Sequence, residues 1–255
     1  MISPLAYVDS SAKLGKNVIV HPFAYIDKNV EIGDDCVIMP HASLMSGTRM
    51  GNRNRVFNGA VIAAEPQDFH YKGGDTLTVI GDDNVIRENV VINRSSTPEG
   101  QTVIGNGNFL HEGVHVSHDT KIGNRSVFGY GCKISGNCVL EDFVIFGGNV
   151  LMSQGSRVGA WSMIQTGCRF HKDIPPFIVA AKEPTVYYGV NSYIMSHEGF
   201  SEKVIKHIGH AYRIIYQGNS SITDALLMIK DQVPMSDEIQ HIIDFVKVSE
   251  LGIIR

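Results

Sequence analysis

Several features that would place this chain in a special class are missing. Its 255 residues include only four cysteines (Cys36, Cys132, Cys138 and Cys168), and none of them forms a C-x-x-C pair. This pattern argues against a zinc ribbon and against a secreted disulfide framework. No apolar run reaches 18 residues, and the N-terminus lacks the basic and apolar regions of a signal peptide. We therefore expect a cytoplasmic protein without a membrane span.

Charge is also scarce and nearly balanced. Charged residues make up 19% of the chain, the formal net charge is −4, and no block of Lys or Arg stands out. This balance argues against a general nucleic-acid-binding protein. Hydrophobic residues make up 43%, so the chain can bury a sizeable core and is not disordered throughout.

The chain does contain a six-residue repeat that fills most of its length. Apolar residues occupy the first position of 26 hexads, which run from Ile2 to Ile62, from Ile80 to Ile92 and from Ile104 to Phe170. The fifth position is usually small and includes all four cysteines, which predicts that they pack inside as small hydrophobes. The second position is often glycine, as at Gly33 and Gly51, which we attribute to a corner that needs a positive φ.

A unit this short and regular predicts a mainly β protein, a parallel β-helix. Three hexads close a triangular coil of 18 residues, so about nine coils stack into a prism roughly 40 Å long at ~4.8 Å per coil. The hexads break at 66–79 and at 95–102, which predicts loops ejected from corners, where functional residues are common. The crossover rule alone would favour a right-handed coil.

A helical period replaces the hexads near the end of the chain. Ser201, Ser221 and Ser236 each precede a segment with one apolar face, and each is a candidate helix N-cap. We therefore expect residues 1–189 to form the β-helix and residues 190–255 to form a small helical domain on its end.

The 18-residue period converts sequence spacing into spatial neighbours. His118, Gly136 and Gln154 lie 18 residues apart, so they should line one edge in successive coils, about 4.8 Å apart. Such a row suits acyl transfer, because a histidine can act as a general base and a glycine N–H can bind an oxyanion. An exposed corner histidine without a catalytic role is the alternative that the spacing leaves open. His111, His115 and His118 also form H-x₃-H-x₂-H, but their side chains would diverge on a β-helix, so we expect no metal site.

The motifs in this frame are similar to those of the bacterial UDP-N-acetylglucosamine O-acyltransferases. The matching segments are PQDFHYKG (66–73), IGDDNVIRENVVINR (80–94), HVSHDTKIGN (115–124), DIPPFIVA (173–180), YGVN (188–191), GFS (199–201) and AYRIIYQG (211–218). The resemblance covers nearly the whole chain. It implies a left-handed β-helix and a homotrimer with active sites between neighbouring prisms.

The resemblance also implies a reaction. A 3-hydroxyacyl group would pass from acyl carrier protein to the 3-hydroxyl of UDP-N-acetylglucosamine, the first step of lipid A synthesis. His118 would be the general base, Asp119 its partner, and the N–H of Gly136 the oxyanion donor. The sugar hydroxyl would attack the thioester directly, so neither a metal nor a bound cofactor is implied.

Further residues match positions that line the substrate cleft of that family. They are Gln67, Asp68, His70, Arg94, His115, Asn137, Gln154, Asn191 and His197. Gln165 and Thr166 fall where the family determines acyl-chain length. His70 stands where the family usually has Lys, and His197 stands where it usually has a basic pair, so Arg94 or Lys172 is a candidate replacement contact for the nucleotide.

Other functions remain as alternatives. One is a CoA-dependent acetyltransferase of a small sugar or amine on the same scaffold, and another is N-acylation of a 3-amino UDP-sugar. A γ-carbonic-anhydrase-like metalloenzyme and a non-catalytic β-helix are the further possibilities. Docking of an acidic carrier protein would need a basic patch. Its candidate members are Arg125, Arg157, Arg169, Lys172, Lys182, Lys203 and Lys206.

Overall fold

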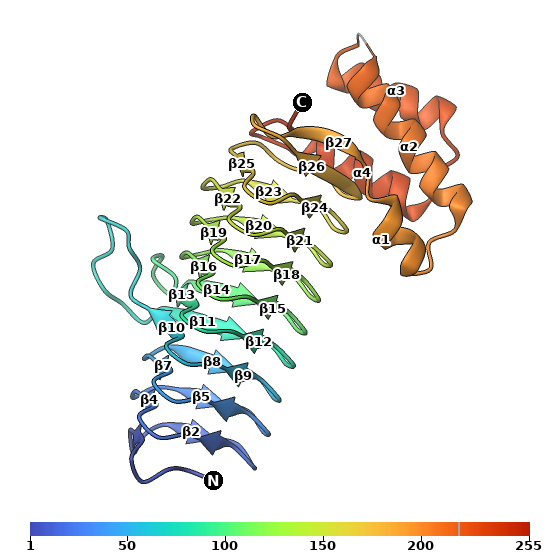
Figure 1. Ribbon diagram of the computed structural model, residues 1–255. Coiled ribbons are helices and arrows are strands. Elements are labelled where there is room, and N and C mark those ends of the chain that lie inside the picture. Colours follow the sequence, from blue (N-terminus) through green and yellow to red (C-terminus); the bar gives the residue numbers. More distant parts are fainter. Residues whose placement is uncertain (219) are drawn as a thin grey trace.

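The chain winds into a left-handed parallel β-helix that carries helices at its C-terminal end (Figure 1). The computed structural model describes residues 1–218 and 220–255. Each of the three prism faces is one sheet, and each face receives every third strand until the last coil.

The strands fall into three sheets, which we name the first, second and third faces. The first face contains β1 (Tyr7–Val8), β4 (Tyr25–Ile26), β7 (Ser43–Leu44), β10 (Val61–Ala64), β13 (Val91–Asn93), β16 (His115–Val116), β19 (Lys133–Ile134), β22 (Leu151–Met152) and β25 (Arg169–Phe170). The second face contains β2 (Lys13–Leu14), β5 (Glu31–Ile32), β8 (Thr48–Met50), β11 (Leu77–Ile80), β14 (Gln101–Ile104), β17 (Lys121–Ile122), β20 (Val139–Leu140) and β23 (Arg157–Val158). The third face contains β3 (Ile19–Val20), β6 (Val37–Ile38), β9 (Arg55–Val56), β12 (Val85–Ile86), β15 (Phe109–Leu110), β18 (Val127–Phe128), β21 (Ile145–Phe146), β24 (Met163–Ile164), β26 (Ile178–Ala181) and β27 (Val186–Val190).

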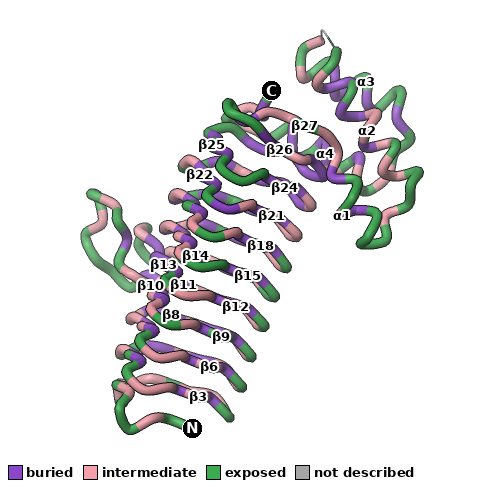
Figure 2. Tube along the Cα trace, in the orientation of Figure 1, coloured by how far each residue is buried: buried purple, intermediate pink, exposed green. Residues whose placement is uncertain are grey.

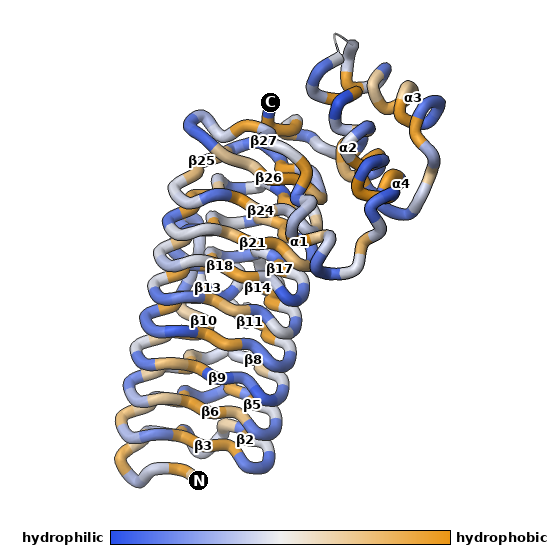
Figure 3. The backbone as a smooth tube through the Cα atoms, turned by 45° about the vertical axis from the view of Figure 1, so that its right-hand side comes forward, coloured by the Kyte–Doolittle hydropathy of each residue, from blue (hydrophilic) through white to orange (hydrophobic). Residues whose placement is uncertain are grey.

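The first hexad positions fill the interior of the prism, as the repeat predicts. Register pairs such as Phe128↔Phe146 stack residues 18 apart, and first-position residues such as Ile26, Ile38 and Leu44 are fully buried. All four cysteines are free and buried, so their interpretation as small hydrophobes is confirmed. Buried positions recur in every coil (Figure 2), and hydrophobic stretches alternate with hydrophilic corners along the tube (Figure 3). Ile2, in the first coil of the prism, is 52% exposed.

The explanation of the second-position glycines was wrong. Gly51 does not have a positive φ; that conformation belongs to the fourth position of the hexad, as at Asp35 (φ 58) and Arg53 (φ 55). A Cβ on Gly51 would lie 2.1 Å from Oδ1 of Asp82 in the next coil. The glycine is needed because the neighbouring coil approaches too closely for any side chain.

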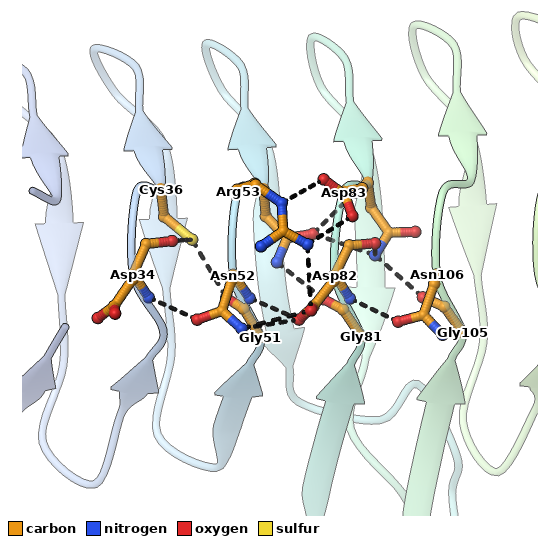
Figure 4. A network of polar contacts seen from close by, with 12 residues as sticks. Asp34, Cys36, Gly51, Asn52, Arg53, Gly81, Asp82, Asp83, Gly105 and Asn106 are labelled. Carbon is orange, nitrogen blue, oxygen red and sulfur yellow. Dashed lines mark hydrogen bonds and ion pairs between the residues drawn. The ribbon is translucent and has the colours of Figure 1, made fainter. Parts of the chain in front are cut away.

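Because the coils approach so closely, polar side chains form a row of hydrogen bonds along the corner between the second and third faces (Figure 4). The backbone N–H of Asp34 donates to Oδ1 of Asn52 at 2.8 Å, and the N–H of Asn52 donates to Oδ1 of Asp82 at 2.7 Å. The N–H of Asp82 then donates to Oδ1 of Asn106 at 2.8 Å. Each bond satisfies a corner N–H that no strand partner reaches and contributes about 1 kcal/mol.

Two loops leave the prism from the corner between the first and second faces, which we name the first corner. Residues 65–76 connect β10 to β11, and residues 94–100 connect β13 to β14. Both project from the same side of the prism, in consecutive coils (Figure 1). The coil that follows them contains β16, so both loops lie next to the corner after that strand.

The described residues of the C-terminal part form the helices α1 (Ser192–His197), α2 (Glu202–Gln217), α3 (Ile222–Gln232) and α4 (Asp237–Lys247). Three predicted N-caps are confirmed, because the Oγ atoms of Ser201, Ser221 and Ser236 accept the N–H three residues on. The short α1 and the antiparallel pair β26–β27 were not predicted. No helix in the described residues is long and apolar enough to cross a membrane.

Polar contacts fasten the helices to the last coils. The buried carboxylate of Asp173 accepts the hydroxyl of Ser249 at 2.7 Å and the N–H of Arg157 at 2.8 Å. Nε2 of His241 on α4 lies 2.7 Å from Oε2 of Glu141 on the prism. The hydrogen bond to Glu141 raises the pKa of His241 against the opposing effect of burial.

Candidate active site

The first corner carries the residues that spacing predicted to be neighbours. His118 follows β16, Gly136 follows β19 and Gln154 follows β22, and these strands pair in parallel with residues 18 apart in register. The structure therefore brings His118, Gly136 and Gln154 onto one edge. Loop 94–100 leaves this corner one coil before His118, and loop 65–76 leaves it two coils before.

A polar network surrounds the His118 ring on its Nδ1 side. Nδ1 lies 2.8 Å from Oδ2 of Asp119 and 3.0 Å from Oγ of Ser96. The Ser96 hydroxyl and N–H donate to the same carboxylate oxygen, at 2.9 Å and 3.1 Å, and Ser95 donates to Oδ1. Loop 94–100 thus fixes the Asp119 carboxylate against the imidazole.

These donors keep Asp119 ionised. Burial would raise the pKa of Asp119, but hydrogen bonds from Ser95, His118 and Ser96 outweigh it and hold the pKa at about 2. An ionised carboxylate at Nδ1 favours the tautomer that carries its proton there. The lone pair of Nε2 is then free to accept a proton, as a general base requires.

Gly136 lies against the Cε1 and Nε2 atoms of the ring. A Cβ at this position would lie 2.7 Å from both Cε1 and Nε2 of His118, so only glycine leaves the ring in place. Among the described residues no hydrogen bond engages the Gly136 N–H. The Asn137 N–H, by contrast, donates to the His118 carbonyl at 3.0 Å. The corner therefore offers a proton acceptor and an unused N–H donor side by side.

The three histidines of the H-x₃-H-x₂-H pattern take different neighbours. His111 packs against the ring of Phe109, with 4.6 Å between centroids. Nε2 of His115 lies 2.7 Å from Oδ1 of Asn93, and burial lowers the pKa of His115, helped by the charge of Lys133. Within the described parts of the chain, no group of three His, Cys, Asp or Glu side chains is arranged to hold a metal.

Loop 65–76 brings Asp68 to the network. Its carboxylate accepts the N–H of His70 at 2.9 Å, and this bond is the main reason for its lowered pKa. The proximity of His118 and Ser96 lowers that pKa further, so Asp68 lies near the His118–Asp119 pair. Gln67 and His70 have exposed side chains on the same loop.

Arg94 contacts both this loop and the strand before it. Its Nη1 donates to the carbonyl of Ala63 at 3.1 Å, and its Nε donates to the hydroxyl of Tyr71 at 3.2 Å. The guanidinium also lies 5.7 Å from the centre of the Tyr71 ring. Arg94 therefore holds the loop with contacts inside the chain.

Four residues suggested by the resemblance lie elsewhere in the chain. Gln165 and Thr166 follow β24, on the corner between the third and first faces. Asn191 is 3% exposed and donates to the carbonyl of Trp161 at 2.9 Å, and His197 ends α1. One chain alone does not bring these four to the His118 corner.

Sequence reasoning missed Ser95, Ser96 and Asn93 as parts of the site. They contact Asp119, His118 and His115 although 22 to 24 residues separate each pair. The signal was the loop at 95–102, whose hexad phase places its base on the corner one coil before His118. Polar residues at that base should have been assigned to the site.

Comparison with known proteins agrees with this geometry. Residues 173–254 match the family model described as UDP N-acetylglucosamine O-acyltransferase, domain 2, and residues 101–136 match the bacterial transferase hexapeptide with six repeats. The acyl-[acyl-carrier-protein]–UDP-N-acetylglucosamine O-acyltransferase of Halorhodospira halophila is 35% identical over 100% of this chain and 99% of the relative.

Solved structures give the same result. LpxA from Bacteroides fragilis, a UDP-N-acetylglucosamine acyltransferase, is 51% identical, with a TM-score of 0.98 and 100% of both chains covered. LpxA from Acinetobacter baumannii is 30% identical, with a TM-score of 0.96 over 100% of this chain and 99% of that one.

The prism and its polar corner define an acyltransferase of the hexapeptide-repeat class. The chain belongs to the family of acyl-[acyl-carrier-protein]–UDP-N-acetylglucosamine O-acyltransferases.

Proposed function

We propose that this protein transfers a 3-hydroxyacyl group from acyl carrier protein to the 3-hydroxyl of UDP-N-acetylglucosamine, the opening step of lipid A synthesis. The observation that carries the mechanism is the pairing of His118 with an ionised Asp119 on one side and Gly136 on the other. Family membership supports the two substrates, since both are in the name of the relative at 35% identity.

In the proposed reaction, Nε2 of His118 removes the proton from the sugar 3-hydroxyl as its oxygen attacks the thioester carbonyl. The Asp119 carboxylate orients the ring and stabilises the imidazolium that forms. The N–H of Gly136 binds the negative charge on the carbonyl oxygen. When the C–S bond breaks, the imidazolium returns its proton to the departing thiolate, so the ester and the free thiol are the only products.

Gln67, Asp68 and His70 would hold the sugar, because their loop leaves the corner beside His118. His115, Asn137 and Gln154 would line the same cleft. We further propose that Gln165, Thr166 and His197 reach this cleft from a neighbouring copy. The side chain of Asn191 is buried and bonded to Trp161, so it would support that copy's contact from inside its own chain. A homotrimer with shared sites would explain why one chain leaves them on other edges.

The test combines purified protein, UDP-N-acetylglucosamine and 3-hydroxyacyl carrier proteins of several chain lengths, with mass spectrometry of the nucleotide sugar. We expect a 3-O-acylated product from the wild type and a rate at least about 100-fold lower for His118→Ala. A 3-amino UDP-sugar and acetyl-CoA are run as competing substrates. No product from any carrier-bound donor, or an unimpaired His118→Ala variant, would reject the proposal.

A further inference from the structure

A cavity with a cationic lining lies at the C-terminal end of the first corner. It encloses about 300 Å³ between β25, the turn that joins β26 to β27, and the last residues of the chain. Its basic side chains are Arg169, Lys172 and Arg255, joined by His171. Among the described residues that line it, Glu183 is the acidic one. The cavity therefore favours an anion.

The strand register places this cavity in line with the catalytic corner. β16, β19, β22 and β25 are consecutive in the first face, and His115, Lys133, Leu151 and Arg169 are paired in that order. Lys172 follows Arg169 by three residues, as His118 follows His115. Three coil steps of ~4.8 Å separate Lys172 from His118 along the edge, which is about 14 Å.

The basic side chains of the cavity are not engaged by acidic partners. None of the ion pairs in the described residues involves Arg169, Lys172 or Arg255. Arg157, by contrast, is engaged within the chain, because it lies 4.0 Å from Asp173 and over the ring of Phe245. Of the sequence candidates for a carrier-binding patch, Arg169 and Lys172 are the two that line this cavity.

We propose that Arg169 and Lys172 bind the phosphate of the carrier protein's phosphopantetheine arm, with Arg255 completing the cationic wall. This inference rests on the proposed function, because it takes the acyl carrier protein as donor. The carrier protein would dock at the C-terminal end of the first corner. Its phosphopantetheine arm would then run along the edge, past Gln154, to Gly136.

Length supports the carrier arm over the nucleotide sugar. The arm from its phosphate to the thioester sulfur is about as long as an extended peptide of four to five residues, roughly 16 Å. That length spans the ~14 Å between Lys172 and the His118 corner. The diphosphate of UDP-N-acetylglucosamine is attached to C1 of the sugar ring, only two carbons from the reacting 3-hydroxyl. It therefore lies much nearer to His118 than to the backbone of Lys172 while that hydroxyl lies at His118.

The experiment measures carrier binding and sugar binding separately in the R169A/K172A double variant. We expect its Kd for 3-hydroxyacyl carrier protein to rise at least tenfold, with a weaker dependence of Kd on salt, because phosphate and acidic contacts are screened by salt. The KM for UDP-N-acetylglucosamine should stay within twofold. Lys230→Ala removes an exposed lysine on α3 and should leave both constants unchanged.

Two small acyl donors that differ only in the phosphate measure its contribution to binding. Wild-type protein should use 3-hydroxyacyl phosphopantetheine better than 3-hydroxyacyl pantetheine, which lacks the phosphate, and the double variant should lose this preference. An unchanged carrier Kd, or a raised KM for the sugar nucleotide alone, would overturn the inference and in the second case assign the cavity to the nucleotide. Carrier binding is read directly, so a wild type that binds carrier but transfers no acyl group would reject the proposed function and not the docking site.

Discussion

Gly136→Ala tests the geometry of the catalytic corner without removing any functional group. The new methyl would lie 2.7 Å from Cε1 and Nε2 of His118, whereas ordinary contact begins at 3.4 Å. The imidazole must therefore retreat by about 0.7 Å or rotate, because the methyl is fixed to the backbone. A misplacement of this order in a catalytic group costs about 100-fold in rate.

The backbone should tolerate the change. The φ of Gly136 lies outside the left-handed region, and the steric conflict is with a side chain that has solvent on one edge. We expect kcat to fall about 100-fold while the KM for UDP-N-acetylglucosamine and the melting temperature change little. Steady-state kinetics and thermal unfolding of the same preparation measure both effects.

Gly209→Ala is the matched control, because its methyl would meet only Val190, at 3.9 Å. It should keep full activity and stabilise α2 by up to about 1 kcal/mol. A Gly136→Ala enzyme with wild-type kcat would refute the reasoning, since it would mean that the His118 ring does not need its present position.

Three further predictions follow from the network, the row of corner hydrogen bonds and the helix contact. Asp119→Asn should lower kcat at least about 100-fold and leave the fold intact, as measured by kinetics and circular dichroism, because the tautomer support is lost. Gly51→Ala should destabilise by about 1–3 kcal/mol in urea unfolding, because its methyl would lie 2.1 Å from Asp82. His241 has a raised pKa through Glu141, so its stabilisation is complete below about pH 6.5 and fades as pH rises through the folded pKa. His241→Gln should therefore lower the melting temperature at pH 6 but not at pH 9, and an equal loss at both would contradict the linkage.

Much of the fold followed from local periodicity. The hexads predicted the buried rows and the stacking of residues 18 apart, and Ser201 marked a helix start through its side chain alone. The role of Gly51 was misjudged because its constraint comes from Asp82, a residue of the next coil. The short α1 lacks a side-chain cap, so no local sequence pattern predicted it.

The sequence likewise predicted some of the contacts in the candidate site and not others. The row of His118, Gly136 and Gln154 was predictable because the coil period is constant along the prism. The contacts of Ser95 and Ser96 with Asp119 were not, because they depend on how an irregular loop folds back onto the corner. The roles of these residues stay predictions until the variants are measured.

The sequence by itself determined the repeating architecture and the edge on which the chemistry lies, because a fixed period sets which residues are neighbours. Only the tertiary structure decided the protonation of Asp119, the contact between Gly136 and the imidazole, and the cavity that the C-terminal residues form with Arg169 and Lys172. These depend on distances of a few ångströms between coils and loops. Such distances arise from packing of the whole prism, and no local pattern encodes them.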